Sequence, residues 1–124
     1  MDAFRAYRVF EDERFGAGCF CEMRRGELDS GEVVVRTAFA SVNYKDALTA
    51  RGRAKIVRRF PCVAGIDLSG IVESSSDPRF KAGDAVIVHS FGLAAEHDGG
   101  YAEIGRFPAD APSSGAHCAA QPVR

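Results

Sequence analysis

The stretch EVVVRTAFASVNYKDAL, residues 32–48, changes from one structural pattern to another within a few positions. Residues 32–42 are rich in β-branched side chains, which fit the pleated surface of a strand. At Asn43, a residue type that caps helices well, the apolar positions take up helical spacing, and Asp46 follows in the first turn. Gly52 is suited to end that helix. The stretch therefore predicts a strand that leads into a short capped helix.

Short apolar runs separated by turn residues make up most of the remaining chain. Alternating or β-branched patterns predict further strands at residues 4–10, 19–23, 65–73, 84–89 and 100–107. Glycine, serine and aspartate concentrate between these runs, as they do in turns. Many short strands with one or two short helices favour a β-barrel or sandwich over an alternating α/β sheet. The sequence therefore predicts a mainly β fold.

Length and composition are those of one globular domain. A chain of 124 residues can bury a core without the help of metals or disulfides. Its hydrophobic fraction of 46% and charged fraction of 27% are ordinary for such a domain. From Ala109 the sequence becomes small, apolar-poor and aperiodic. We therefore expect a domain at residues 1–108 and an irregular tail at residues 109–124.

Charge and hydropathy narrow the classes of partner and compartment. A net charge of -1 argues against binding to nucleic acid or to an anionic membrane surface. No apolar run approaches the length of a membrane span, and the N-terminus carries charges where a signal peptide needs an apolar stretch. We expect a cytoplasmic protein with reduced thiols, and a homo-oligomer is left open. The cysteines are Cys19, Cys21, Cys62 and Cys118.

Four blocks of sequence follow one another in an order and spacing that resemble a known family. They are SVNYKDAL at 41–48, RRFPCVAGIDLSGIV at 58–72, DPRFKAGDAVIV at 77–88 and HDGGYAE at 97–103. Together they resemble the N-terminal domain of the medium-chain dehydrogenases/reductases, and are most similar to the zinc-independent quinone oxidoreductase and acryloyl-CoA reductase branch. The likeness runs from about Ala3 to Asp110 and implies a GroES-like β-barrel that serves as the catalytic domain.

The resemblance also implies a reaction, a cofactor and site residues. Its members transfer hydride from NADPH, bound by a Rossmann domain, to an α,β-unsaturated carbonyl or a quinone. By position, Tyr44 matches the residue that contacts the nicotinamide, and Asn43 and Asp46 match polar positions at the mouth of the cleft. The implied cofactor-binding residues are therefore Tyr44 and Asn43, and the candidate catalytic residues are Asn43 and Asp46. Spacing alone also allows Asn43 and Asp46 to be only a helix cap and its first-turn carboxylate.

Metal binding is not expected in this branch. Zinc-dependent relatives place a cysteine where Asn43 stands and a histidine where Ile66 stands. A carboxamide is a poor zinc ligand and isoleucine is none. Cys19-x-Cys21 lacks the usual two-residue gap and a second pair at suitable spacing. We therefore predict neither a catalytic nor a structural zinc.

The sequence contains no G-x-G-x-x-G segment between a strand and a helix, so the phosphate-binding element of a Rossmann unit is not found in it. We therefore expect a truncated or frameshifted product that carries the N-terminal catalytic-domain portion of an NADPH-dependent reductase and is inactive alone. The alternative is a non-enzymatic binding or oligomerisation module built on the same barrel. In this alternative an uncovered apolar face would favour self-association.

Two further features, a basic cluster and Asp67, each allow a structural and a functional interpretation. A basic cluster follows the predicted helix and is by default a solvated loop, although it could attract the phosphates of NADPH or coenzyme A. It consists of Arg51, Arg53, Lys55, Arg58 and Arg59. Asp67 is expected at the start of a strand, either as a carboxylate near the cleft or as a hydrogen-bonded turn aspartate.

Overall fold

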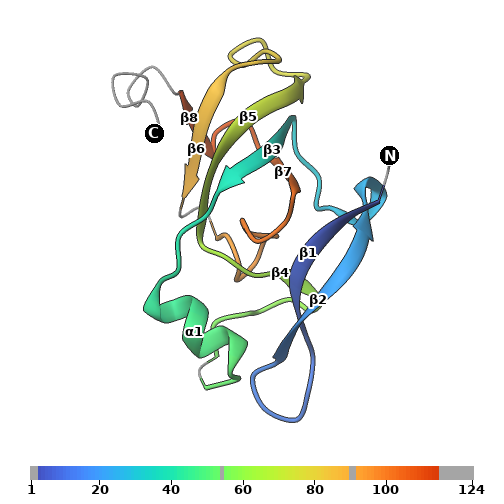
Figure 1. Ribbon diagram of the computed structural model, residues 1–124, viewed down its shortest axis with the longest axis vertical. Coiled ribbons are helices and arrows are strands. Elements are labelled where there is room, and N and C mark those ends of the chain that lie inside the picture. Colours follow the sequence, from blue (N-terminus) through green and yellow to red (C-terminus); the bar gives the residue numbers. More distant parts are fainter. Residues whose placement is uncertain (1–2, 54, 90–91, 115–124) are drawn as a thin grey trace.

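A computed structural model describes residues 3–53, 55–89 and 92–114 of the chain (Figure 1). The strands are β1 (Ala3–Phe10), β2 (Ala17–Arg24), β3 (Val33–Phe39), β4 (Cys62–Val63), β5 (Asp67–Ser75), β6 (Ala85–His89), β7 (Ile104–Phe107) and β8 (Pro112–Ser114). The described part also contains the α-helix α1 (Tyr44–Ala50) and the short 3-10 helix η1 (Arg25–Glu27). The predicted mainly β class is confirmed.

The strands form two antiparallel sheets. The smaller sheet has the order β2-β1-β4, and the larger has the order β7-β3-β5-β6-β8. Figure 1 shows the larger sheet at one end of the molecule and α1 at the other, with the β1–β2 hairpin alongside. A hydrogen bond of 2.8 Å from the Tyr7 N–H to the Tyr101 carbonyl joins β1 to the segment that precedes β7.

Two main apolar clusters fill the core, and the one at the smaller sheet also includes Ile104 of β7. In the larger sheet the fully buried Val33 and Val35 of β3 pack with Val72, Val88 and Phe107 from the neighbouring strands. In the smaller sheet the core is built from Phe4, Ala6, Met23, Leu28 and Val63. Each large apolar side chain that is fully buried contributes on the order of 1.5–3 kcal/mol. The apolar runs of the sequence therefore become the inner faces of these sheets.

The passage from β3 to α1 follows the predicted pattern with a shorter strand. The strand ends at Phe39 rather than at Val42, and both of these side chains are exposed. The helix then begins at Tyr44 with Asn43 in the capping position. Gly52 follows it with a φ of 62°, and a Cβ there would lie 2.7 Å from the Gly16 carbonyl oxygen. The geometry therefore requires glycine at that position.

Residues 109–114 correct the predicted tail. Ala109 and Ala111 are buried in the core of the larger sheet, and the Ala109 N–H donates to Glu32 at 2.8 Å. The following residues form β8, which pairs with β6. The prediction of an irregular segment is therefore wrong for residues 109–114, where packing orders a stretch of weak strand propensity. Residues 115–124, with Cys118, lie outside the described part, and the prediction for them stays a prediction.

Candidate functional site

A hydrogen-bonded polar network surrounds the start of α1. Asp67, the first residue of β5, accepts from the Ser41 N–H at 3.0 Å and from the Ser41 hydroxyl at 2.6 Å. The Asn43 amide nitrogen lies 3.0 Å from Ser41 Oγ and 3.4 Å from Asp67 Oδ2. Although burial works against it, hydrogen bonding by Ser41 and Asn43 holds the pKa of Asp67 below its ordinary value. Asp67 is thus a hydrogen-bonded carboxylate that fixes the segment leading into the helix.

The Asp46 side chain caps the first turn of α1. It is buried, and its Oδ2 accepts from the Asn43 N–H at 2.9 Å and from the Asn43 amide nitrogen at 3.2 Å. Burial of a carboxylate is tolerated only when such hydrogen bonds are made. The capping interpretation of Asp46 is therefore confirmed, whereas a catalytic role for Asn43 or Asp46 stays a prediction.

Tyr44, the first residue of the helix, points its ring into solvent. It is 80% exposed, although large aromatic side chains usually contribute to a core or an interface. Asn43 directly before it is held by the polar network, so the backbone that carries the ring is rigid. The exposed ring at a fixed position can stack on a planar ligand, which is the role expected of Tyr44.

A groove of about 540 Å³ lies between α1 and the β1–β2 hairpin. We call it the α1 groove. Its lining is mostly apolar, and it consists of Arg5, Ala6, Tyr7, Phe20, Thr37, Val42, Asp46, Ala47, Ala50, Gly100, Tyr101, Ala102 and Glu103. A concave apolar surface with a few polar groups is the usual form of a small-molecule site.

Tyr101, which was not among the site residues predicted from the sequence, joins the α1 groove to the polar network. Its hydroxyl donates to the Ser41 carbonyl at 2.7 Å, and its ring meets Tyr7 edge-on. Burial, followed by the nearby charges of Asp46 and Asp67, raises the pKa of Tyr101. The phenol therefore stays protonated at neutral pH. Its position in the block HDGGYAE was the only signal that could have drawn attention to it.

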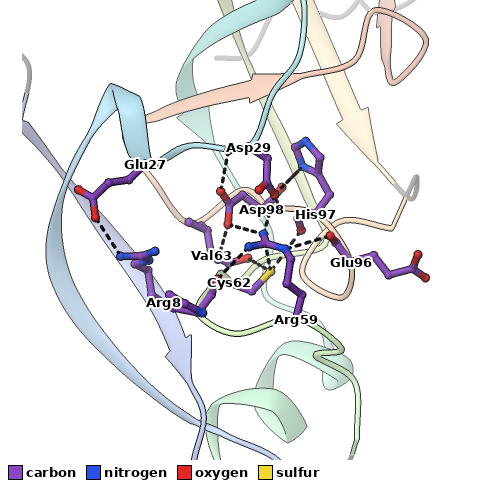
Figure 2. Close-up of polar contacts among 10 residues, drawn as sticks. Arg8, Glu27, Asp29, Arg59, Cys62, Val63, Glu96, His97 and Asp98 are labelled. Carbon is purple, nitrogen blue, oxygen red and sulfur yellow. Dashed lines mark hydrogen bonds and ion pairs between the residues drawn. The ribbon is translucent and has the colours of Figure 1, made fainter.

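A second polar cluster is built around a buried carboxylate (Figure 2). Asp98 is 3% exposed and accepts from the Val63 N–H at 3.0 Å and from Arg59 at 3.3 Å. Arg59 also donates to Asp29 at 2.6 Å, and the Asp98 N–H donates to Asp29 at 2.7 Å. The cluster joins segments far apart in the sequence, which gives Arg59 a structural role that its basic neighbours do not share.

Cys62 and His97 border this cluster. Burial, followed by the charge of Asp98, raises the pKa of the Cys62 thiol to about 12, so the thiol is not a nucleophile at neutral pH. The Nδ1 of His97 is hydrogen-bonded to the Asp98 carbonyl at 2.8 Å. The surroundings of Cys62 thus fit packing rather than catalysis.

Residues 3–53, 55–89 and 92–114 contain neither a metal-binding cluster nor a membrane-spanning helix. In that part no group of three or more His, Cys, Asp or Glu side chains converges as a metal site would require. No helix there is long and apolar enough to cross a membrane. The predicted lack of zinc and the predicted compartment stay predictions.

Known proteins share this sequence and fold. A family model for the alcohol dehydrogenase GroES-like domain matches residues 29–114. The chain is 46% identical over 83 residues to the probable acrylyl-CoA reductase AcuI of Escherichia coli (strain K12), covering 67% of the chain and 26% of that protein. It is 42% identical over 84 residues to the putative quinone oxidoreductase YhfP of Bacillus subtilis (strain 168), covering 68% of the chain and 26% of that protein.

Solved structures agree with these matches. The yhdH oxidoreductase from Salmonella enterica in complex with NADP superposes with a TM-score of 0.84 at 35% identity, covering 89% of the chain and 34% of that structure. Bacillus subtilis yhfP with NAD bound has a TM-score of 0.83 at 34% identity, covering 92% of the chain and 35% of that structure. The chain thus spans about a quarter to a third of the length of these relatives. It belongs to the alcohol dehydrogenase GroES-like domain family, as the N-terminal domain of a medium-chain dehydrogenase/reductase of the quinone oxidoreductase and acrylyl-CoA reductase branch.

Proposed function

We propose that this chain is the catalytic-domain portion of an NADPH-dependent oxidoreductase that reduces an acryloyl-CoA-like enoyl thioester or a quinone. The observation that carries the proposal is the exposed Tyr44 ring beside a rigid polar network and an apolar groove. Relatives named as acrylyl-CoA reductase and quinone oxidoreductase, and a related structure with NADP, support the choice of reaction and cofactor.

The side chains at the start of α1 fit one face of a nicotinamide. The Tyr44 ring is free to stack on a planar heterocycle, and the Asn43 amide is held in place by Ser41 and Asp46. When bound, NADPH supplies a hydride equivalent to the substrate. The contribution of this chain is to orient the reactants and to present hydrogen-bond donors where negative charge develops on a carbonyl oxygen.

The α1 groove supplies the complementary apolar surface. Tyr7, Phe20 and Val42 line it, so an uncharged enoyl group or quinone ring would lose little by leaving water. Tyr101 lies at the junction of the groove and the network with its phenol protonated. Exclusion of water beside a fixed polar group strengthens each hydrogen bond made there.

Nuclear magnetic resonance on the full 124-residue chain tests the proposal. Titration with reduced nicotinamide mononucleotide should shift the signals of Tyr44 and its neighbours, and the Tyr44→Ala variant should lose the effect. Tyr44→Phe should retain it, because stacking needs only the ring. Shifts that avoid the start of α1 would reject the cofactor contact.

We expect the chain alone to show no NADPH oxidation with acryloyl-CoA or a quinone. The reason is that it carries no glycine-rich phosphate loop of the kind that holds the nucleotide in Rossmann units. The measurement is the absorbance of NADPH in the presence of each substrate. Turnover by the purified chain would show that this domain binds the whole cofactor unaided.

A non-enzymatic oligomerisation module is the second candidate. One observation favours it: β2 is an edge strand of the smaller sheet, and its Phe20 is 77% exposed. An unpaired edge with an exposed aromatic residue is suited to association with another chain. Analytical ultracentrifugation with a nucleotide titration distinguishes the two candidate functions. A stable oligomer whose sedimentation does not change when nucleotide is added supports the oligomerisation module.

A further inference from the structure

Four cations that follow α1 make no ion pair with any residue that the structure describes. They are Arg51, Arg53, Lys55 and Arg58, and we call them the post-helix cations. All four are exposed, and none of their side chains has a hydrogen bond or ion pair within the described part of the chain. Five other arginines pair with carboxylates, including the adjacent Arg59. Positive charge is thus left uncompensated in one short region of a chain whose net charge is -1.

The backbone that carries the post-helix cations is held at several points. The Arg53 N–H donates to the Leu48 carbonyl at 2.9 Å, and the Arg58 N–H donates to the Ala95 carbonyl at 2.9 Å. Val57, next to Arg58, is 2% exposed and packs with Val9 and its neighbours. Cations on an anchored backbone lose less conformational entropy on binding than cations on a free loop.

The post-helix cations follow directly on helix residues that line the α1 groove. Ala47 and Ala50 line the groove, and Arg51 follows directly. Tyr7 and Tyr101, which line the groove from the other side, also pack against the cluster that contains Val57. In Figure 1 the chain leaves the end of α1 and runs toward β4 beside the β1–β2 hairpin. The post-helix segment is therefore continuous in the chain with the lining of the groove, starting at Arg51.

Ordinary structural roles account for only part of this charge. Arg51 lies at the C-terminal end of α1, where a cation is favourable beside the helix dipole. The nearby β1–β2 loop carries Glu11, Asp12 and Glu13, but Asp12 is occupied by the N–H groups of its own loop, and none of the three pairs with a post-helix cation. Arginine and lysine side chains left free in this way are well suited to phosphate oxygens.

We propose that the post-helix cations bind the phosphate groups of a polyphosphorylated nucleotide whose uncharged end extends into the α1 groove. The same chemistry occurs in a coenzyme A thioester and in NADPH. The part of the inference that concerns the groove rests on the proposed function, whereas phosphate binding by the cations does not depend on it.

Isothermal titration calorimetry on the full 124-residue chain tests the proposal with coenzyme A, NADPH and inorganic pyrophosphate as probes. The variant Arg53→Ser/Lys55→Ser should weaken binding by at least about tenfold, which corresponds to about 1.4 kcal/mol. Binding should also weaken as salt is added, because the contacts are between exposed charges. The matched control Arg24→Ser/Arg106→Ser removes the same charge elsewhere and should leave the affinity within about twofold.

The outcomes separate the possibilities. An equal loss in both double variants, or no loss in either, would overturn the proposal. Pyrophosphate binding that depends on Arg53 and Lys55, with no response of Tyr44 to the nicotinamide probe, would support it and count against the proposed function. Tighter binding of coenzyme A than of NADPH identifies the substrate as the phosphorylated ligand, and the reverse order identifies the cofactor. Arg24, Arg53 and Lys55 are exposed and Arg106 is half-buried, and unchanged circular dichroism spectra are expected for every variant.

Discussion

The carboxylate of Asp46 illustrates how a single residue can serve the helix and the groove together. It is buried, accepts two hydrogen bonds from Asn43, and also lines the α1 groove. A carboxylate held by two hydrogen bonds cannot rotate freely. A binding site on a short helix needs side chains that are fixed in this way. Tyr44 lies two positions earlier in the same helical turn. Its ring is exposed to solvent, whereas the Asp46 carboxylate is buried.

Replacing Asp46 should destabilise the domain through loss of the cap. We expect Asp46→Ala to lower the free energy of unfolding by about 1–2 kcal/mol, since the Asn43 N–H loses its acceptor. Asp46→Asn should cost less because an amide oxygen can still accept. Urea unfolding measures the difference, with Lys45→Ala as an exposed neighbour that should change it by less than about 0.5 kcal/mol. Equal effects of Asp46→Ala and Lys45→Ala would contradict the cap.

Asp67 should make the stability depend on acid pH. Its pKa is depressed in the folded state, so its contribution is present at neutral pH and is lost as the pH falls below the ordinary aspartate value of about 4. We therefore expect Asp67→Asn to be less stable than the parent at pH 7, with the difference shrinking toward about pH 3. Urea unfolding at several pH values provides the check, and a difference that is constant with pH would exclude this linkage.

At the scale of elements, the larger sheet depends on its last described strand. Residues 109–111 cover the core, and β8 then pairs with β6. The edge of the sheet is thereby extended by a segment whose small residues have weak strand propensity. A neighbouring element can order such a segment, since burial and ladder hydrogen bonds do not require large side chains.

A charge introduced at Ala111 tests this packing. Ala111→Glu should lower the free energy of unfolding by at least about 2 kcal/mol, because the carboxylate would enter the core of the larger sheet. The control is Asp110→Ala, whose side chain is 72% exposed and whose ion pair with Arg79 is worth about 1 kcal/mol at most. If residues 109–114 were irregular, both substitutions would have similarly small effects.

At the scale of the whole molecule, the cluster around Asp98 holds distant segments together. Arg59 links Asp29, which follows η1, with Asp98, which precedes the glycines of the HDGGYAE block. These segments are far apart in the sequence, so bringing them together costs loop-closure entropy. Once the contact has formed, it links the folding of the segments. Paired charges at such a junction specify how the segments meet.

Removal of the Arg59 guanidinium should be strongly destabilising. Arg59→Met leaves the buried Asp98 without its cation, and we expect a loss of about 2–3 kcal/mol, reduced from the fully buried case because Arg59 is itself 41% exposed. Arg58→Met is the matched control, since its side chain is exposed and unpaired within the described residues. Thermal and urea unfolding report the difference. Similar values for the two variants would mean that the cluster contributes little.

Local patterns in the sequence determined the mainly β class, the strand that leads into α1, the Asn43 cap and the glycine after the helix. Each depends on residues within a few positions of one another, and such short-range preferences can be read directly from spacing. The four sequence blocks also identified the family correctly. The roles proposed for Tyr44 and Asn43 were inferred from that family and still await their tests.

Only the tertiary structure decided the pairings between distant residues. It brought Tyr101 to Ser41, Arg59 to Asp29 and Asp98, and β8 to β6. No periodic pattern in the sequence predicts these contacts, because they join segments that meet only after the two sheets have formed. The same reason explains why the five cations of residues 51–59 looked alike in sequence. Pairing with the distant, buried Asp98 separates Arg59 from the four post-helix cations, which make no ion pair within the described residues.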